Sequence, residues 1–407
     1  MIIWRGYNHI KSNKICEDYS DYYDDGEKYI CVVADGHGSD DYPRTDKGSK
    51  MAVECAIDCT KEFIDASYTD NDERSISIED ILKDEKRGFP LLMMLAKSIL
   101  LDWHKHVDDH FNANPFTVDE LKNVSEKYKL KYSSQEDNDI TMDKNYYKAY
   151  GCTLILYAIT DKYSFGLQIG DGKCIVIDGD GQFSEPIPWD DNCQLNVTTS
   201  ICDNDASNEF RFFVTEEKPA AVFCGSDGID DSYASIEELH ALYRSIISVF
   251  AEHGEEIGKK EIKEYLPVLT QKGSGDDVSI GLIINMDMVK GLTQVLDIQS
   301  KLFNLEKEEK EKMQQLNTNI EKEEALSNRI KKWHDSKALL KKNIRDDNVK
   351  LKEIHTLKRN LENDIKVIGN QSKKMRDALL NLLSDLKKSA KNDMENKMED
   401  NSRGNIT

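Results

Sequence analysis

Short apolar segments alternate with amphipathic segments over the first 290 residues. Six segments rich in Val, Ile and aromatic residues, each bounded by Gly, Asp or Asn, predict buried strands at 28–35, 152–160, 164–171, 173–179, 220–227 and 277–285. Apolar residues at helical spacing predict helices after Lys47, from Pro90 to about Phe111, and from Ser235 to Gly254. Because strands and helices do not alternate strictly, we expect a layered α+β domain over 1–290.

Polar signals divide this domain further. Thr117–Glu120 and Ser235–Glu238 have the spacing of capping boxes, which predicts that a helix begins after each of them. The segments 66–88 and 131–147 are polar and are predicted to be exposed insertions.

After about residue 291 the pattern changes to a long helical repeat. Positions three and four apart keep one seam without a break from Leu340 to Leu386, and eleven of the 14 are apolar. We expect a coiled coil or a long helical hairpin over 291–390, followed by a disordered tail over 391–407. The partner helix would come from a second copy, another protein, or the chain's own preceding residues. Asp347 and Lys358 within the seam would weaken a simple dimer.

Charge is distributed unevenly along the chain. Residues from Gly291 onward carry 25 basic and 20 acidic side chains, whereas the whole chain carries 55 and 76. The first 290 residues therefore hold the acidic excess, which repels nucleic acid and anionic membranes. We expect neither as a partner.

The cysteine inventory is typical of a reducing compartment. All nine cysteines precede residue 225, their number is odd, and no CxxC pair occurs. Because we also find neither a signal-peptide pattern nor an apolar stretch of membrane-spanning length, we expect a cytoplasmic location. Cys55 and Cys59 lie four apart and are expected to be small core residues. His106 and His110 have the same spacing, but without a supporting motif we expect a solvated helix face rather than a zinc site.

Acidic residues next to glycine stand at the ends of four predicted strands. They lie in VVADGHGS (Asp35), IGDG (Asp171), CGSDGIDD (Asp227 and Asp231) and GSGDDVS (Asp276). Carboxylates at strand ends are held rigidly and can converge, and oxygen ligands select hard cations such as Mg²⁺ or Mn²⁺. Two such ions sharing a water would activate it for attack on a phosphoryl group. An isolated Asp-Gly is usually only a turn, so the order of the motifs carries the prediction.

That order resembles the protein phosphatase type 2C (PPM) family of metal-dependent serine/threonine phosphatases. The matching stretches are CEDYS (16–20), VVADGHGS (32–39), YGCTLILY (150–157), IGDGK (169–173), CGSDGIDD (224–231) and GDDVSIGLI (275–283). The opening residues and PFTVDEL look most like the bacterial branch. The resemblance implies a sandwich of two antiparallel sheets flanked by helices, with metal ions in a cleft at one edge, followed here by the helical coiled-coil tail.

The resemblance also implies roles for single residues. Asp35 would bridge both metal ions, and Gly36 would offer its carbonyl oxygen. His37 would be the general acid that protonates the leaving oxygen. The other implied residues are Asp227 and Asp276 as ligands of the second ion, Glu17 and Asp18 as holders of metal-bound waters, and Asp171 and Asp231 as ligands of a possible third ion.

One position departs from the family pattern. Many members carry a phosphate-gripping arginine four residues before the glutamate of the CEDYS-like motif, and here that position is Asn13. Lys11 and Lys14 are the candidates to bind phosphate in its place, as point charges.

Two functions follow from these motifs. The first is a phosphatase that hydrolyses phosphoserine and phosphothreonine in proteins with two Mg²⁺ or Mn²⁺ ions. The alternative is a catalytically weak, phosphatase-like scaffold that recruits a partner through its coiled coil. A scaffold of this kind would be expected to lose metal-binding aspartates, and this chain keeps them.

Overall fold

The structure is a computed structural model that describes residues 1–69, 75–83, 85–133, 146–193, 197–335 and 341–403. The chain divides into two compact units, Met1–Leu292 and Thr293–Thr407.

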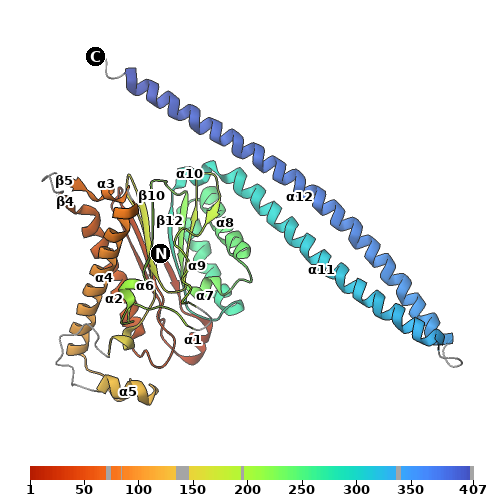
Figure 1. Cartoon of the computed structure of the whole chain (residues 1–407), viewed down its shortest axis with the longest axis horizontal. Helices are drawn as coiled ribbons and strands as arrows, with labels where there is room; N and C mark the ends of the chain where they lie inside the picture. Colours follow the sequence, from red (N-terminus) through yellow and green to blue (C-terminus); the bar gives the residue numbers. More distant parts are fainter. Residues whose placement is uncertain (70–74, 84, 134–145, 194–196, 336–340, 404–407) are drawn as a thin grey trace. The chain divides into compact units, whose positions relative to one another are not determined.

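The first unit is built on two five-stranded sheets in which every pair of neighbouring strands is antiparallel (Figure 1). One sheet has the order β1 (Ile2–Trp4), β12 (Val278–Ile284), β11 (Ala221–Gly225), β8 (Lys173–Ile177), β9 (Phe183–Ser184). The other has the order β10 (Arg211–Thr215), β7 (Ser164–Ile169), β6 (Leu154–Ile159), β3 (Tyr29–Ala34), β2 (Tyr19–Asp24). A small hairpin joins β4 (Ser67–Thr69) to β5 (Ser75–Ser77). The predicted α+β sandwich is confirmed.

Helices cover both outer faces of the sandwich, with α2 and α4 on one side and α8 and α9 on the other (Figure 1). Their bounds are α1 (Tyr7–Ser12), α2 (Thr45–Asp65), α3 (Ile78–Leu82), α4 (Glu85–Ala113), α5 (Glu126–Ser133), α6 (Ala206–Glu209), α7 (Asp227–Asp230), α8 (Ile236–His253), α9 (Glu255–Lys272) and α10 (Met286–Gly291), with a 3₁₀ turn at Tyr147–Tyr150.

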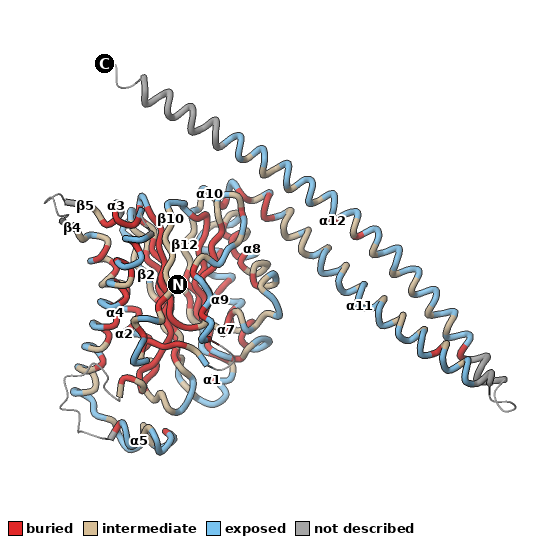
Figure 2. The backbone as a smooth tube through the Cα atoms, in the orientation of Figure 1, coloured by how far each residue is buried: buried red, intermediate tan, exposed pale blue. Residues whose placement is uncertain are grey.

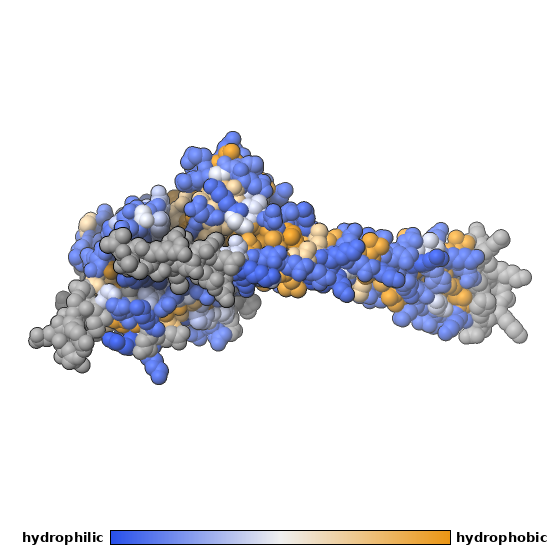
Figure 3. Space-filling view, turned by 90° about the horizontal axis from the view of Figure 1, so that it is seen from above, coloured by the Kyte–Doolittle hydropathy of each residue, from blue (hydrophilic) through white to orange (hydrophobic). Residues whose placement is uncertain are grey.

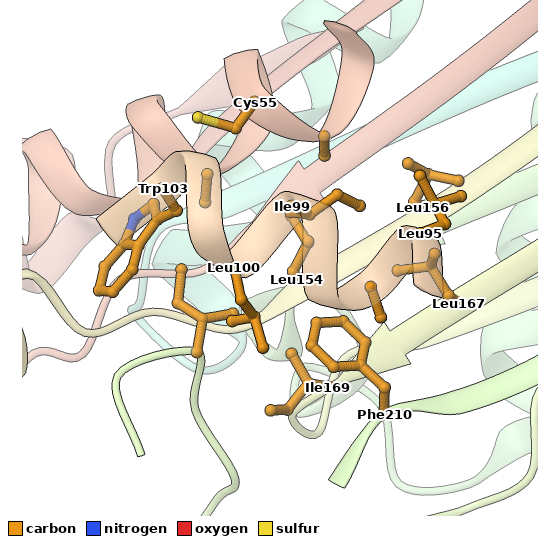
Figure 4. Close-up of a cluster of buried hydrophobic side chains, with 14 of the residues drawn as sticks. Cys55, Leu95, Ile99, Leu100, Trp103, Leu154, Leu156, Leu167, Ile169 and Phe210 are labelled. Carbon is orange, nitrogen blue, oxygen red and sulfur yellow. The ribbon is translucent and has the colours of Figure 1, made fainter. Parts of the chain in front are cut away.

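The strands of the second sheet are apolar on both faces because both faces are covered. On β3, Ile30 and Val32 face α2 and α4, whereas Cys31 and Val33 face the other sheet. Figure 4 shows α4 side chains, among them Trp103, packed over the strands that carry Leu154 and its neighbours. Figure 2 shows the resulting continuous buried interior.

Helix ends follow the capping signals in one case and not in the other. The Ser235 side chain accepts a hydrogen bond from the Glu238 amide, and α8 ends before Gly254, whose φ is 83°. Thr117 and Glu120 also make capping-box hydrogen bonds, but no helix follows until Glu126. The Glu120 carboxylate pairs with buried Arg44, which holds this segment as a turn.

Two other predictions need correction. The segment 66–88 is not wholly an exposed insertion, since Ile78 and Leu82 of α3 are buried in the main core. The second helix begins before Pro90, at Glu85. Most of the other predicted insertion, 134–145, lies outside the described residues.

The second unit consists of α11 (Thr293–Asp335) and α12 (Lys341–Arg403), which pack side by side in antiparallel directions (Figure 1). Every seam position from Asp347 to Leu386 is buried or half-buried, whereas Val349 and Val367 between them are exposed. The seam therefore packs on the chain's own preceding helix. Helix α12 extends past the start of the segment predicted to be disordered, and residues 404–407 lie outside the described part.

The polar seam residues are paired across this hairpin. Asp347 accepts two hydrogen bonds from Arg329, at 2.7 and 2.6 Å, and the Lys358 ammonium lies 3.4 Å from a Glu323 carboxylate oxygen. Figure 3 shows the outward surface of the hairpin as mostly hydrophilic, with scattered apolar residues.

Among the helices that the structure describes, none combines the length and the apolar character needed to cross a bilayer.

The seam makes a direct stability prediction. Ile368 is only 5% exposed, so Ile368→Ala removes buried contacts and should destabilise the hairpin by about 2 kcal/mol, which corresponds to about 30-fold faster amide exchange in α12. Val367→Ala is the matched control, because Val367 is 56% exposed and should have little effect. Hydrogen exchange with mass spectrometry measures both. Equal amide exchange rates in the two variants would contradict the packing of this seam against α11.

Candidate functional site

Two strands of one sheet bring the first acidic residues together. The register pairs Tyr19 at the start of β2 with Ala34 at the end of β3. Asp18 precedes the first of these residues and Asp35 follows the second, so antiparallel pairing places the two carboxylates next to each other.

The other sheet contributes further acidic residues at the same end of the sandwich. Gly225 at the end of β11 pairs with Ile280 near the start of β12. This pairing places Asp227, which begins α7, beside the Asp276–Asp277 turn that precedes β12.

Four carboxylates form what we call the acidic cluster: Glu17, Asp18, Asp35 and Asp227. The carboxyl of Asp35 shares hydrogen bonds with those of Asp18 and Asp227. Its burial, followed by the charges of these two neighbours, raises the pKa of Asp35 well above the ordinary value. Burial likewise raises the pKa of Glu17 and of Asp18 to about 7, and that of Asp227 to about 6.

The donor set of the cluster fits divalent cations. Glu17 Oε2 and Asp18 Oδ2 are buried acceptors without a hydrogen-bond partner among the described residues. Buried acceptors of this kind are normally satisfied by a donor, a water or an ion. Their oxygen-only chemistry suits Mg²⁺ or Mn²⁺, whose charge would also offset the repulsion between the carboxylates.

Gly36 follows Asp35 in a confined place. A Cβ atom there would lie 2.4 Å from the carbonyl oxygen of Glu17 and 2.5 Å from Thr45 Oγ1. Only glycine fits without displacing the segment that carries Glu17.

Asp276 and its neighbour Asp277 have different environments. Asp277 is 2% exposed and accepts hydrogen bonds from the amides of Gly6 and Glu17, both at 2.6 Å. Burial raises the pKa of Asp277, but hydrogen bonds from His9 and from these amides outweigh it, so the net pKa is lowered. The side chain of Asp276 is 56% exposed, and its Oδ1 accepts a hydrogen bond of 2.8 Å from the Asp277 amide.

His9 is a site residue that the sequence analysis missed. Its Nδ1 lies 3.0 Å from Asp277, and its Nε2 lies 3.6 Å from both Glu17 and Asp276. The contact with Asp277 raises the pKa of His9 against the effect of burial. A lone histidine on a short helix gave no signal of this position.

A second acidic group lies at the edge of the cluster. Burial raises the pKa of Asp171, and the charge of exposed Asp231 adds to this shift. Asp230, which the sequence analysis did not select, has its pKa raised to about 8 by burial, and its Oδ1 has no partner among the described residues.

His37 lies beside the cluster against an aromatic ring. Its ring meets that of Tyr42 edge-on at 4.5 Å, and Tyr42 accepts a hydrogen bond from Lys148 at 2.6 Å. Burial, with a smaller effect from Lys148, lowers the pKa of His37 to about 4. The imidazole is therefore neutral near pH 7 in this arrangement.

The two candidate phosphate-binding lysines differ in position. Lys14 donates a hydrogen bond of 2.6 Å to the Gly38 carbonyl, and its ammonium lies 3.9 Å from Glu17. The ammonium of Lys11 instead lies over the Tyr7 ring, 4.3 Å from its centre. Asn13 ends α1 with φ of 57°, a left-handed conformation that asparagine tolerates better than arginine.

Comparison with known proteins shows what this chain is similar to. The family model described as Protein phosphatase 2C matches residues 5–267. Similar solved structures include serine/threonine phosphatase Stp1 from Staphylococcus aureus (14% identity, 67% of this chain and 90% of that chain, TM-score 0.39). PppA, a regulatory component of T6SS in Pseudomonas aeruginosa, is 14% identical over 70% of this chain and 95% of that chain, with a TM-score of 0.41. The catalytic domain of PstP with two manganese ions is 12% identical over 70% of this chain and 96% of that chain, with a TM-score of 0.38. No curated protein matches.

The raised carboxyl pKa values predict how stability depends on pH without metal. Between about pH 5 and about pH 8 the folded cluster releases protons that the unfolded chain has already lost, so stability should fall as pH rises, by on the order of 2 kcal/mol. The raised pKa of His9 acts in the same direction. The lowered pKa of His37 acts in the opposite direction below about pH 6.5 and is outweighed by the carboxyls, and the lowered pKa of Asp277 leaves its contribution constant in this window. Urea unfolding in a chelator measures the trend.

Two controls accompany this experiment. Saturating Mg²⁺ should flatten the trend, because the ion replaces the protons. Asp227→Asn should reduce it, because that variant removes one of the titrating groups. Stability that is constant or rising over this window in the metal-free protein would contradict the assignment.

Gly36 supplies a second prediction. Gly36→Ala should displace the Glu17 backbone and weaken Mg²⁺ binding at least about 10-fold, since the new methyl group has no space. Gly38→Ala in the same loop is the control, because its Cβ would meet nothing closer than 3.4 Å. Calorimetric Mg²⁺ titration compares the two. Unchanged affinity in Gly36→Ala would remove this glycine from the site.

Proposed function

The chain belongs to the protein phosphatase 2C family, and we propose that it hydrolyses phosphoserine and phosphothreonine in proteins with two Mg²⁺ or Mn²⁺ ions held at the acidic cluster. It is a metal-dependent phosphoprotein phosphatase. The observation that carries the proposal is the meeting of Asp18, Asp35 and Asp227 in one buried place, where Asp18 Oδ2 has no hydrogen-bond partner among the described residues.

The ligands divide by position. Asp35 lies between Asp18, which comes from the same sheet, and Asp227, which comes from the other sheet. We therefore assign Asp35 to bridge both ions, with the Gly36 carbonyl beside it. Asp227 and Asp276 would supply the remaining ligands of the second ion, and Glu17 and Asp18 would hold metal-bound waters. When bound, the ions would lower the pKa of a shared water and offset charge on the phosphoryl oxygens.

Asp171 and Asp231 are the proposed ligands of a third ion. The negative charge of Asp231 repels that of Asp171 and helps to raise the pKa of Asp171, so a cation near both carboxylates would relieve this repulsion. Asp231 is exposed, which fits a weaker and exchangeable site.

The residues around the cluster would hold the phosphate and the leaving group. Lys14 is the proposed phosphate contact, because its ammonium faces Glu17 while that of Lys11 is engaged with Tyr7. His37 is the proposed proton donor to the leaving oxygen. A bound phosphate dianion would raise the pKa of His37, so the donor would form only with substrate present.

Substitution of the proposed core ligands tests this assignment. Asp35→Asn and Asp227→Asn should each lower Mn²⁺-dependent hydrolysis of a phosphothreonine peptide by at least about 100-fold, because a bridging or terminal metal ligand is lost. The fold should persist, since each change removes a buried charge from a repulsive cluster. Metal-free Asp35→Asn should even be more stable than wild type near pH 7.5.

Asp161→Asn is the matched control, because Asp161 is exposed in a turn away from the cluster. Retained turnover in both Asp35→Asn and Asp227→Asn would contradict the assignment of these residues as metal ligands. A wild-type protein that hydrolyses neither the peptide nor p-nitrophenyl phosphate with Mn²⁺ would overturn the proposed function itself.

A further inference from the structure

A second group of metal-binding side chains lies between two helices, apart from the acidic cluster. Cys55 of α2 and Asp102 and His106 of α4 each offer a donor atom, and the three atoms lie within 4.8 Å of one another. We call them the α2–α4 cluster. Cys55 is ten residues along α2 from Thr45 beside Gly36, or about 15 Å of helix. Figure 4 shows Cys55 on α2 beside the part of α4 that carries Trp103.

Two of the three distances between donor atoms in this cluster are close to the edges of a tetrahedral zinc site. The Cys55 sulfur lies 3.5 Å from His106 Nδ1, and that nitrogen lies 3.6 Å from Asp102 Oδ1. In a tetrahedral zinc site, bonds of about 2.3 Å to sulfur and about 2.1 Å to nitrogen and oxygen place sulfur about 3.6 Å from nitrogen, and nitrogen about 3.4 Å from oxygen. The donors are therefore already close to the spacing that a single ion requires.

The mixture of donors selects the kind of ion. Thiolate, imidazole and carboxylate together suit Zn²⁺, whereas Mg²⁺ and Mn²⁺ prefer oxygen alone. We propose that Cys55, Asp102 and His106 form a zinc site that clamps α2 to α4. Cys59 lies one helical turn after Cys55 and is half-buried, but it is not one of the three residues whose donor atoms lie together.

Carboxylates around the cluster favour a cation there. Burial, and after it the charge of Asp102, raises the pKa of the Cys55 thiol and that of the Cys59 thiol, and a cation would offset this charge. Without an ion, His106 Nδ1 lies 2.9 Å from the carbonyl oxygen of Asp102, one turn back on its own helix. Zinc would displace the protons of this imidazole nitrogen and of the thiol, as metal binding does generally.

The clamp would support the catalytic end of the domain. From α2, Thr45 Oγ1 donates a hydrogen bond of 2.7 Å to the Gly151 carbonyl, and Ser49 Oγ donates one of 2.7 Å to the Glu17 carbonyl. Fixing α2 against α4 therefore helps to fix the backbone that carries Glu17. His110, one helical turn after His106 on α4, does not belong to the α2–α4 cluster, because its Nδ1 lies 2.9 Å from the Tyr150 hydroxyl.

Cobalt titration of the full chain under reducing conditions tests the site. With Mg²⁺ in excess, Co²⁺ should bind with about one equivalent and give the near-ultraviolet absorption of a thiolate–cobalt bond, which Zn²⁺ should abolish by competition. The oxygen-only acidic cluster cannot give this absorption. The result is therefore independent of whether the protein proves to be an active phosphatase.

Variants assign the absorption to these residues. Cys55→Ser should abolish it, and His106→Gln should weaken cobalt binding at least about 10-fold, whereas His110→Gln and Cys202→Ser should match wild type. His106 is exposed, so its variant remains informative if Cys55→Ser fails to fold, as judged by circular dichroism. Absence of thiolate absorption in wild type, or its full retention in His106→Gln, would overturn the proposal.

Discussion

Mutual repulsion of buried carboxylates is the constraint on which the rest of this structure depends. Asp18, Asp35 and Asp227 meet where the two sheets end together, and burial and mutual repulsion raise their pKa values there. A protein gains nothing in stability from such a group unless something positive occupies it. Protons would do so at low pH, and under the proposed function divalent cations would do so at neutral pH. The same cluster therefore links the fold, its pH dependence and its chemistry.

The surrounding structure holds this repulsive group in place. Asp277, itself a carboxylate, binds the amides of Gly6 and Glu17 and pairs with His9, which ties the N-terminal segment to the start of β12. From the opposite side, Ser49 of α2 binds the Glu17 carbonyl. These contacts fix the backbone around the cluster through neutral donors and one histidine, so the acidic side chains themselves remain available to cations.

The sequence predicted the parts of the fold that repeat a pattern. Buried strands such as β3 and β6 are apolar on both faces, and the seam of α12 recurs over many turns, so both were recognisable. Asp35 and Asp227 stood at strand ends beside glycine and were recognisable for the same reason. His9, Asp230 and the short edge strands were missed, because a single side chain or a three-residue strand becomes distinctive only through long-range contacts. Glu120 shows the opposite error, in which a local capping signal formed its hydrogen bonds while Arg44 prevented the helix.

The charge of the first unit sets the order in which ligands must bind. Its first 290 residues carry a large acidic excess, and a phosphorylated substrate is itself an anion. Near the cluster, Lys14 is one cation against several carboxylates, and Asn13 stands where an arginine would otherwise add a fixed positive charge. The field at the site therefore becomes attractive to phosphate only after cations have entered. In the proposed site the metal ions would serve as the main phosphate-binding charge as well as the activators of water, which would make substrate affinity depend on metal occupancy to a greater degree than an arginine-bearing site requires.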